Sequence, residues 1–340
     1  MKKNKNFWNG KSVLITGASG FVGSNLSKNL NKNGAKVVGL IQSKKKKSLL
    51  FYEKVDKNID LIFGDINDRT LLKKILIKFK IEICFHLAAQ VEVGLARKDP
   101  FGTWETNVRG TYSLLDTIRE NKKYVKSIIV ASSDKAYGEH GISRMPYQEN
   151  YKLKPLFVYD TSKACADMIA KSYASKLFNL PIVISRFSNI YGPGQLNFTA
   201  LIPDAITSCL KNKTFKMRGD GEAIRDFIHI DDIVDVYKIL SKELYLSPSK
   251  YSGQVFNAGT NSPQKIRDVV KLIYLHNKKK NIFEAVVKNI KKNKTVGEIS
   301  VQFMDYKKLY KYFRWKPKKN FRKSLPALFK WYANYLKKSS

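Results

Sequence analysis

Residues 12–23 read SVLITGASGFVG, and this stretch decides the fold. The β-branched run at 12–16 predicts a buried strand. Apolar residues at helical spacing from Val22 to Leu30 predict an amphipathic helix, and the apolar run at 36–41 predicts a second strand. The stretch therefore begins a βαβ unit whose first turn carries glycines.

Those glycines, Gly17, Gly20 and Gly23, have the spacing G-x-x-G-x-x-G. The first allows a tight turn, the second lets the backbone approach a pyrophosphate, and the third lets helix and strand pack closely. The N-terminus of the helix then faces the phosphates. The turn therefore predicts a dinucleotide site. Its other candidate contacts are Ser19, Phe21 and Val22.

Strand and helix patterns continue to alternate after this unit. Such alternation predicts an α/β fold, a Rossmann-type doubly wound parallel sheet with a smaller α/β substrate-binding lobe. We expect the dinucleotide-binding domain to comprise 8–186 plus about 230–258, and the second lobe 187–229 plus about 259–340. Further strands are expected at 59–63, 81–87, 126–131, 181–186 and 254–257, and helices at 71–79, 103–120, 161–178 and 321–336, the last as a surface helix.

The residues at the end of the second strand indicate whether NAD or NADP binds. An acid there binds the adenosine ribose, whereas a basic residue tolerates a 2′-phosphate. The segment Gln42-Ser43-Lys44 carries no acid, which leans toward NADP over NAD without deciding between them. Asp65 follows the third strand and is placed for the adenine edge, although a turn alone would also explain it. Further candidate contacts are Ile66, Leu87, Ala88 and Ala89.

The composition is strongly basic, with a formal net charge of +35 and Lys spread over the whole chain. A solvated basic surface without a dedicated function is one explanation, and a polyanionic partner such as nucleic acid is the other. No segment approaches the roughly 18 consecutive apolar residues of a membrane span. We therefore expect a soluble, cytoplasmic protein.

Cysteine and histidine are few and dispersed. We expect the cysteines to be buried and reduced, because they are widely spaced in apolar surroundings. No metal site is predicted, and the first and third histidines are expected as core or loop residues. The residues are Cys84, Cys165 and Cys209, and His86, His140, His229 and His276.

A polar cluster is predicted at the carboxyl end of the strand at 126–131. Residues 131–138 read ASSDKAYG and follow that strand directly, where ligands bind in open parallel sheets. Tyr159 and Lys163 come at the entrance of the helix expected at 161–178, one turn apart and hence on one face. A hydroxyl, a carboxyl, an amine and a phenol are thereby expected beside the dinucleotide.

Six ordered motifs resemble the extended short-chain dehydrogenase/reductases, in particular the NAD-dependent epimerase/dehydratase family that acts on nucleotide sugars. The resemblance covers about residues 11–335. Within it, Ser133-Asp134-Lys135 is similar to the nucleotide-sugar 4,6-dehydratases, and most to the CDP-glucose type, which has Asp-Lys where the dTDP-glucose type has Asp-Glu. The motifs are TGASGFVG at 16–23, HLAAQ at 86–90, ASSDKAYG at 131–138, Tyr159 with Lys163, RFSNIYGPG at 186–194 and RDFIHIDD at 225–232.

The resemblance implies that a sugar is first oxidised at C4. Tyr159 would accept the proton of the C4 hydroxyl while hydride passes to the nicotinamide, so the pKa of this phenol has to fall from about 10. Lys163 would favour the phenolate and hold the nicotinamide ribose. Ser133 would share the hydrogen bond to the C4 oxygen.

Elimination of water across C5 and C6 would follow. Asp134 would be the acid for the C6 hydroxyl, which requires a buried, protonated carboxyl, and Lys135 stands where a base for C5 is needed, which requires a neutral amine. Hydride would return to C6, so the resemblance implies a tightly bound, recycled dinucleotide and an NDP-4-keto-6-deoxy sugar as product.

The resemblance places the grip on the nucleotide diphosphate at Asn189, Arg218 and Arg225, since the Arg guanidinium presents a fork to phosphate. It also implies a homodimer through the helices at 103–120 and 161–178. Three alternatives stay open: a nucleotide-sugar epimerase, which needs the oxidation without the elimination; a GDP-mannose 4,6-dehydratase; and a basic scaffold that binds nucleic acid.

Overall fold

The computed structural model describes residues 6–44, 48–290 and 298–339, and its largest element is a seven-stranded sheet. The strand order is β10-β6-β5-β4-β1-β2-β3, and the pairings from β3 through to β6 are parallel. The order reverses at β1 and β4, so the predicted Rossmann-type doubly wound α/β fold is confirmed. The strands are β1 (Ser12–Thr16), β2 (Lys36–Ile41), β3 (Asp60–Phe63), β4 (Ile83–His86), β5 (Ser127–Ala131), β6 (Ile182–Phe187) and β10 (Val255–Ala258).

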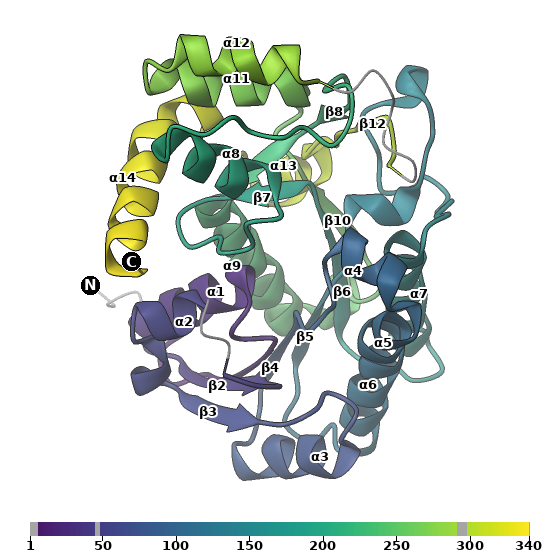
Figure 1. Cartoon of the computed structure of the whole chain (residues 1–340). Coiled ribbons are helices and arrows are strands. Elements are labelled where there is room, and N and C mark those ends of the chain that lie inside the picture. Colours follow the sequence, from purple (N-terminus) through teal and green to yellow (C-terminus); the bar gives the residue numbers. More distant parts are fainter. Residues whose placement is uncertain (1–5, 45–47, 291–297, 340) are drawn as a thin grey trace, which may run out of the picture. The chain divides into compact units, whose positions relative to one another are not determined.

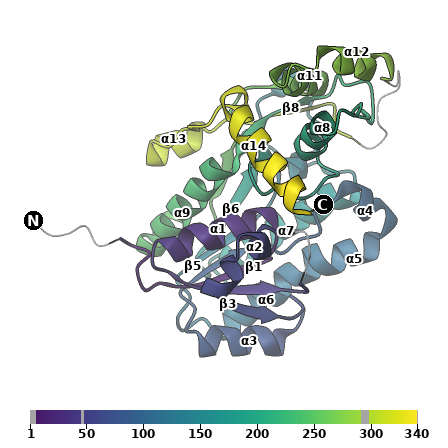
Figure 2. The same cartoon turned by 60° about the vertical axis from the view of Figure 1, so that its left-hand side comes forward.

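Helices cover both faces of this sheet (Figures 1 and 2). The neighbours Cys84 and Phe85 on β4 point to opposite faces, as strand geometry requires. Cys84 packs in a core with Leu114 and Leu115 of α6 (Gly110–Glu120), whereas Phe85 meets Tyr237 edge-on with 5.8 Å between ring centroids. The covering helices are α3 (Arg69–Lys78), α6 and α7 (Val158–Ala174) on one face and α1 (Phe21–Lys32) and α9 (Ile230–Leu246) on the other; short helices are α2 (Leu49–Tyr52), α4 (Val93–Lys98), α5 (Pro100–Trp104) and α10 (Pro248–Tyr251).

The helix expected at 103–120 is interrupted in the middle. Helix α5 ends at Trp104, residues Glu105–Arg109 form a π-helical turn, and α6 begins at Gly110. Single π-helical turns inside α-helices are frequent at functional sites. This one carries Asn107 into the interior, where its side chain is buried.

Helix α7 begins at Val158, three residues before the predicted start at residue 161. Tyr159 and Lys163 therefore both lie within the helix, four residues apart. Its buried face carries Tyr159, Lys163 and Asp167. Small residues between them let the helix approach the sheet closely.

One face of this helix was expected to be suited to core or dimer packing. Ile169 and Tyr173 pack against the hydrophobic core of unit 1. Met168 and Leu177 are 62% and 80% exposed, so they do not pack in the core, and dimer packing stays a prediction for them. Polar and charged residues with fixed partners, rather than the larger apolar ones, occupy the most buried side of α7.

The chain divides into two compact units, which are described separately. Unit 1 comprises the described residues of Met1–Tyr137, Lys152–Arg186 and Val234–Phe256, and unit 2 comprises those of Gly138–Tyr151, Phe187–Ile233 and Asn257–Ser340. Segment Gly138–Tyr151 is held within unit 2, where the backbone N–H of Asn257 donates to the Glu149 carboxylate at 2.9 Å. The role assigned to each domain from the sequence stays a prediction.

Unit 2 has a hydrophobic core of its own, and helix α14 contributes to it. The tail was expected to form a surface helix, and α14 has the exposed polar side and buried apolar stripe of one. The stripe packs on α8 and α11, and it comprises Phe321, Leu325, Leu328 and Tyr332. The elements are β7 (Asn189–Tyr191), β8 (Ile224–Arg225), β9 (Phe227–His229), β11 (Gln264–Lys265), β12 (Val301–Gln302), α8 (Leu201–Leu210), α11 (Ile266–His276), α12 (Lys280–Lys288), α13 (Lys307–Phe313) and α14 (Phe321–Ser339).

The three cysteines carry free thiols, but they are not all buried. Cys84 and Cys209 are buried, whereas Cys165 is partly exposed on α7, so the expectation of burial is wrong for Cys165. Within the described part of the chain, no cluster of three or more histidine, cysteine or acidic side chains is arranged to hold a metal ion. None of the described helices has the length and apolarity needed to cross a lipid bilayer.

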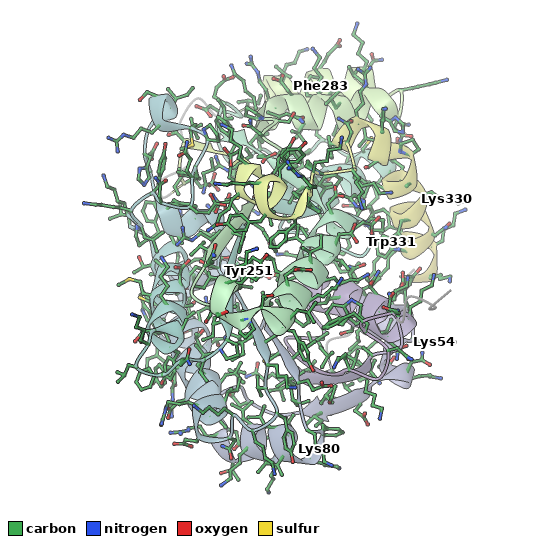
Figure 3. The ribbon with its side chains drawn as sticks, turned by 180° about the vertical axis from the view of Figure 1, so that it is seen from behind. Lys54, Lys80, Tyr251, Phe283, Lys330 and Trp331 are labelled. Atoms are coloured by element: carbon green, nitrogen blue, oxygen red, sulfur yellow. The ribbon has the colours of Figure 1, made fainter. Side chains whose placement is uncertain are left out.

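Lysine occupies surface turns in which glycine or asparagine is more usual. Lys54 and Lys80 are exposed, have φ values of 57° and 47°, and point away from the ribbon (Figure 3). The left-handed region is disfavoured for residues with a Cβ. Lysine at these positions is consistent with a general bias in composition, because the turns themselves would favour other residues.

A buried ion pair joins β6 to α7 in unit 1. Arg186 donates through Nε and Nη2 to the two carboxylate oxygens of Asp167 at 2.7 and 2.9 Å, and neither side chain is exposed. The guanidinium also lies over the ring of Tyr137, 4.6 Å from its centroid. This pair therefore fixes α7 against the strand and against the turn that contains Tyr137.

We predict that Asp167→Asn lowers the free energy of unfolding by about 3–5 kcal/mol, because it leaves the Arg186 charge buried without its counter-ion. Urea titration followed by circular dichroism measures this loss. The control is Asp116→Asn on α6, whose partly exposed pairs with Arg69 and Arg119 are expected to contribute less than about 1 kcal/mol. Equal losses in the two variants would contradict the structural role of the buried pair.

Candidate active site

The turn after β5 holds two buried polar side chains. Ser133 and Asp134 are 9% and 5% exposed. The Ser133 hydroxyl donates to Asp134 Oδ1 at 3.0 Å and accepts the backbone N–H of Lys135 at 3.2 Å. A further hydrogen bond joins the Ser133 hydroxyl to the phenol of Tyr159. The structure therefore brings together three of the predicted catalytic side chains.

Burial controls the ionisation of Tyr159 and Lys163. Burial raises the pKa of Tyr159, and the neighbouring Ser133 only partly offsets this. The lowered pKa that the resemblance implies for this phenol during the reaction stays a prediction. The Lys163 ammonium donates to the carbonyl oxygen of Ala131, and burial lowers the pKa of Lys163 to about 8 although Asp167 acts in the opposite direction.

The glycine turn between β1 and α1 forms a close-packed cradle. Gly17 has a φ of +69°, and a Cβ at this position would lie 2.8 Å from the backbone nitrogen of Ala88. A Cβ at Gly23 would lie 2.3 Å from the carbonyl oxygen of Gly17. Helix α1 begins after Gly20 without a side-chain cap. Its first amide groups thus suit an anionic ligand, as a dinucleotide pyrophosphate requires.

The ends of β2 and β3 are joined by polar contacts. Gln42 donates to Asp65 Oδ2 at 3.2 Å, and Asp65 Oδ1 accepts the backbone N–H of Asn67 at 2.8 Å. Asp65 therefore stabilises the turn, which was the alternative explanation for this residue, and it lies beside the Gln42 side chain. Ile66 is 8% exposed and its side chain packs in the core. This leaves the backbone of Ile66, rather than its side chain, to contact a cofactor.

A buried hydrogen-bond network at the ends of β1 and β4 was missed by the sequence analysis. Thr16 Oγ1 accepts the backbone N–H groups of Leu87 and Ala88, both at 3.1 Å. Its own hydrogen is then directed to His86 Nδ1 at 3.0 Å, which leaves His86 Nε2–H to donate to Thr111 Oγ1 at 3.0 Å. Burial lowers the pKa of His86 to about 3, so the ring is neutral near pH 7.

Asn107 in the π-helical turn extends this network to α7. Thr111 Oγ1 donates to the Asn107 carbonyl oxygen at 2.6 Å. The Asn107 amide binds both backbone groups of Gln90, at 2.7 and 3.0 Å, and donates to Ser162 Oγ at 2.8 Å. Ser162 donates in turn to the Tyr159 carbonyl oxygen at 2.7 Å. The segment after β4 and the backbone of Tyr159 are therefore held by one amide side chain.

In unit 2, the predicted residue Arg225 is largely buried and is bonded to the backbone. Its Nη1 donates to the Ile224 carbonyl oxygen at 2.9 Å, and its Nη2 lies 3.7 Å from a carboxylate oxygen of Glu298. Asn189 Nδ2 donates to the Asp226 carbonyl oxygen at 3.3 Å, so Asn189 lies beside the Arg225 strand. The ion pair with Glu298 was not predicted, because nothing in the local pattern relates residues this far apart.

Arg218, the third residue of the predicted diphosphate grip, is exposed. Its guanidinium donates to the carbonyl oxygen of Thr199. This contact lies in a loop and does not involve Asn189 or Arg225. The structure therefore brings two of the three residues together and places Arg218 on a separate segment of unit 2.

A family model described as GDP-mannose 4,6 dehydratase matches residues 14–327. The chain belongs to this family of nucleotide-sugar dehydratases and epimerases. Membership confirms the resemblance drawn from the six motifs.

Members of the family share moderate sequence identity with this chain. CDP-glucose 4,6-dehydratase of Salmonella typhimurium is 32% identical, over 73% of this chain and 71% of its own length. dTDP-D-glucose 4,6-dehydratase of Dictyostelium discoideum is 34% identical, over 77% of this chain and 61% of its own length.

Solved structures of the family cover almost the whole chain. dTDP-glucose 4,6-dehydratase from Bacillus anthracis in complex with NAD has a TM-score of 0.83 and 26% identity, covering 96% of this chain and 98% of that one. UDP-glucose 4-epimerase of Thermotoga maritima with UDP-glucose has a TM-score of 0.82 and 26% identity, covering 96% and 99%. Dehydratases and epimerases thus share this fold.

We predict that His86→Gln makes folding less sensitive to acid in this family member. The native state holds His86 neutral whereas the unfolded state protonates it near pH 6.5, so the unfolded state binds one more proton between pH 6.5 and about 3. Wild-type stability therefore falls with decreasing pH in that window, by about 1.4 kcal/mol per pH unit from this residue. Denaturant titrations at several pH values should show a slope shallower by that amount in the variant.

The control for this prediction is His276→Gln, because His276 is exposed at the end of α11. This variant should keep the wild-type slope. If His86→Gln also keeps the wild-type slope, the His86 ring is not held neutral and the direction of the hydrogen bonds assigned above is wrong.

Proposed function

We propose that this protein is a nucleotide-sugar 4,6-dehydratase that forms an NDP-4-keto-6-deoxy sugar. The observation that carries the proposal is the buried carboxyl of Asp134, hydrogen-bonded through Ser133 to Tyr159. A C4 epimerisation needs the phenol but has no use for a carboxyl acid at C6. The buried Ser133-Asp134 pair therefore favours elimination over simple epimerisation.

In the proposed first step, Tyr159 accepts the proton of the C4 hydroxyl, and the Ser133 hydroxyl turns from Asp134 to donate a hydrogen bond to the C4 oxygen. Since burial raises the pKa of Tyr159, the phenolate needs a neighbouring cation. Lys163, one helical turn away on the same face of α7, is placed to supply that charge. The carbonyl of Ala131 holds Lys163 in the protein without ligands.

The cradle at Gly17, Gly20 and Gly23 would hold the pyrophosphate of a dinucleotide, and Asp65 and Ala88 would line its sides. A bound nicotinamide dinucleotide would supply the hydride acceptor for C4 and the hydride donor for C6. Structures of similar proteins contain NAD, which supports NAD, whereas Gln42 in place of an acid keeps NADP as the alternative. Mass spectrometry of the nucleotide released from purified protein distinguishes the two.

In the proposed second step, Lys135 removes the C5 proton and Asp134 protonates the C6 oxygen. The C5–H and C6–O bonds break, a C5–C6 double bond forms beside the C4 ketone, and the C6 oxygen leaves as water. Lys135 then returns its proton to C5 as C6 becomes a methyl group. The proton gained by Tyr159 balances the proton lost by Asp134, so exchange with solvent resets both groups.

We propose CDP-glucose as the favoured substrate, with unit 2 binding its diphosphate through Asn189, Arg218 and Arg225. Two observations support this choice, the Asp134-Lys135 pair and the 32% identity to a CDP-glucose 4,6-dehydratase. GDP-mannose is the rival substrate, because the matching family model carries that description. Epimerisation is the rival reaction, supported by the likeness to UDP-glucose 4-epimerase.

The proposal is tested by incubating the purified protein with CDP-glucose, GDP-mannose, dTDP-glucose and UDP-glucose and analysing the products by mass spectrometry. We expect loss of 18 mass units from one of them, as water leaves, with CDP-glucose preferred. A product of unchanged mass but altered configuration at C4 would establish the epimerase instead. No reaction with any of the four would overturn the proposal.

Variants of the same assay test the assigned roles. Asp134→Asn should lower kcat for dehydration by about 10²–10⁴-fold, because an amide cannot protonate the C6 oxygen. It should still oxidise the sugar at C4, seen as reduced-nicotinamide absorbance on mixing with substrate, since Tyr159 and Lys163 are intact. Tyr159→Phe should lose both activities, and equal loss of both in the two variants would contradict the separate role of Asp134.

We also propose a homodimer that forms through helices α5, α6 and α7, which contact one another in unit 1. They carry exposed apolar side chains: Phe101 is 75% exposed, Tyr112 is 43% exposed and Met168 is 62% exposed. Covering such side chains by a second copy would remove apolar surface from water.

Light scattering tests this proposal. The wild-type protein should have twice the 39.0 kDa mass of one chain, and Tyr112→Lys with Met168→Lys should have the single mass with an unchanged circular dichroism spectrum. A matched variant with lysine at exposed Leu246 should remain dimeric. A wild-type protein of single mass would exclude the dimer.

A further inference from the structure

Unit 2 contains a pocket whose lining includes none of the proposed catalytic or substrate-binding residues. Its volume is about 490 Å³, within the range of roughly 300–1,000 Å³ that small-molecule sites occupy. One wall is the turn at Thr260 and Asn261 that follows β10, and the other is the start of α13 with the segment after it. All of its lining residues belong to unit 2.

The turn on the first wall is rigidly held. Buried Asp226 accepts the backbone N–H of Thr260 at 2.7 Å, the Thr260 hydroxyl, and the backbone N–H of Asn261 at 3.3 Å. Asn261 has a φ of 52°, which suits asparagine in a tight turn. This wall is therefore preformed, with the Asn261 amide available at its surface.

The second wall combines cations with aromatic rings. Lys307 and Lys316 line the pocket together with Tyr306 and Tyr310. Lys307 is 80% exposed along its side chain, and Tyr310 is 46% exposed. Tyr306 is supported from behind by the buried Trp315, with 5.9 Å between ring centroids.

The charge balance of the pocket is positive. The one acid in the lining, Asp305, is buried; it accepts the Lys307 backbone N–H at 3.2 Å and lies 3.7 Å from Lys307 Nζ. Among the residues that the structure describes, no carboxylate lies within ion-pair distance of Lys316. Asp305 thus partly neutralises the charge of Lys307, whereas Lys316 keeps its full charge.

The surroundings strengthen this positive potential beyond the general basicity of the chain. Residues 307–319 contain 7 Lys or Arg among 13 residues, against 63 among 340 for the whole chain. Residues 306–340 contain no Asp or Glu. Arg314, at the end of α13, lies over the Tyr310 ring at 5.5 Å. The segment is therefore richer in cations than the chain as a whole, and Lys319 at its end pairs with Asp231 at 3.7 Å.

We propose that this pocket is a second ligand site that binds the phosphate groups and base of a nucleotide, separate from the substrate grip at Arg225. Lys307 and Lys316 bind the phosphates, the exposed Tyr310 ring offers a face for the base, and the Asn261 amide offers a donor and an acceptor to its edge. Arg225 and Asp226 are consecutive residues of unit 2, so the strand that carries the proposed diphosphate contact also anchors the pocket wall.

The experiment is isothermal titration of the full-length protein with CDP, with ADP and with inorganic pyrophosphate at 0.15 M salt. We expect two equivalents of nucleotide to bind per chain, the first at the substrate-binding residues around Arg225 and the second in this pocket. Lys316→Ala with Tyr310→Leu should weaken the second equivalent at least tenfold and leave the first within twofold. Pyrophosphate should bind the second site at least tenfold more weakly than the nucleotides, because it lacks a base.

The matched control is Lys330→Ala, which removes one exposed cation from α14 in the same unit (Figure 3). This variant should retain both equivalents with unchanged affinity. A single equivalent in the wild-type protein, or equal weakening by Lys330→Ala, would overturn the site. If the second site binds pyrophosphate as tightly as CDP and ADP, its ligand is not a nucleotide. If it binds single-stranded RNA and not mononucleotides, the surface is a nucleic-acid site instead.

These outcomes are independent of the proposed reaction. Lys316 and Tyr310 take no part in the proposed chemistry, so their variant is expected to dehydrate the sugar at the wild-type rate. A protein that shows no dehydratase activity can still bind the second nucleotide. Conversely, a confirmed dehydratase with one nucleotide site would remove only the inference about this pocket.

Discussion

The buried, bidentate ion pair between Arg186 and Asp167 is the interaction on which the arrangement of unit 1 depends. Removing Asp167 would leave the Arg186 charge buried without its carboxylate, whereas Asp167 also has Lys171 Nζ at 3.5 Å, so the pair ties β6 to α7. The guanidinium also packs on Tyr137, the last residue of the turn that contains Ser133 and Asp134. One ion pair thus holds the helix of Tyr159 and Lys163 and the turn of Ser133 in fixed positions.

Burial has the same electrostatic consequence at three groups around this arrangement. It raises the pKa of Tyr159, lowers the pKa of Lys163 to about 8 and lowers the pKa of His86 to about 3. Each shift favours the uncharged form, because a low dielectric penalises charge. Burial therefore disfavours charge at these groups, and the proposed proton transfers require compensating charges from substrate and dinucleotide. The network through Asn107 links the segment after β4 to the backbone of Tyr159.

The large positive charge of the chain has two separate components. Lysine at exposed left-handed turns such as Lys54 and Lys80 reflects composition, since these positions have no evident use for a cation. The segment 307–319 is different, because its cations alternate with aromatic rings beside a preformed pocket. A uniform basic surface would attract anions everywhere, whereas a cluster with aromatic faces and hydrogen-bonding groups can select among them. Position, rather than total charge, distinguishes these two components.

The amino-acid sequence by itself determined the features that depend on local rules. Glycine spacing after a strand, strand and helix periodicity, and the four-residue separation of Tyr159 from Lys163 all act over short distances, so the fold and the proximity of Ser133 to Tyr159 could be predicted. Tertiary structure alone decided the π-helical turn at Asn107, the hydrogen-bonded state of His86, the raised pKa of Tyr159 and the helices on which α14 packs. Each of these depends on which distant residues surround a side chain, and periodicity carries no information about such neighbours. The pocket beside α13 belongs to this second group, because its two walls are formed by segments more than forty residues apart.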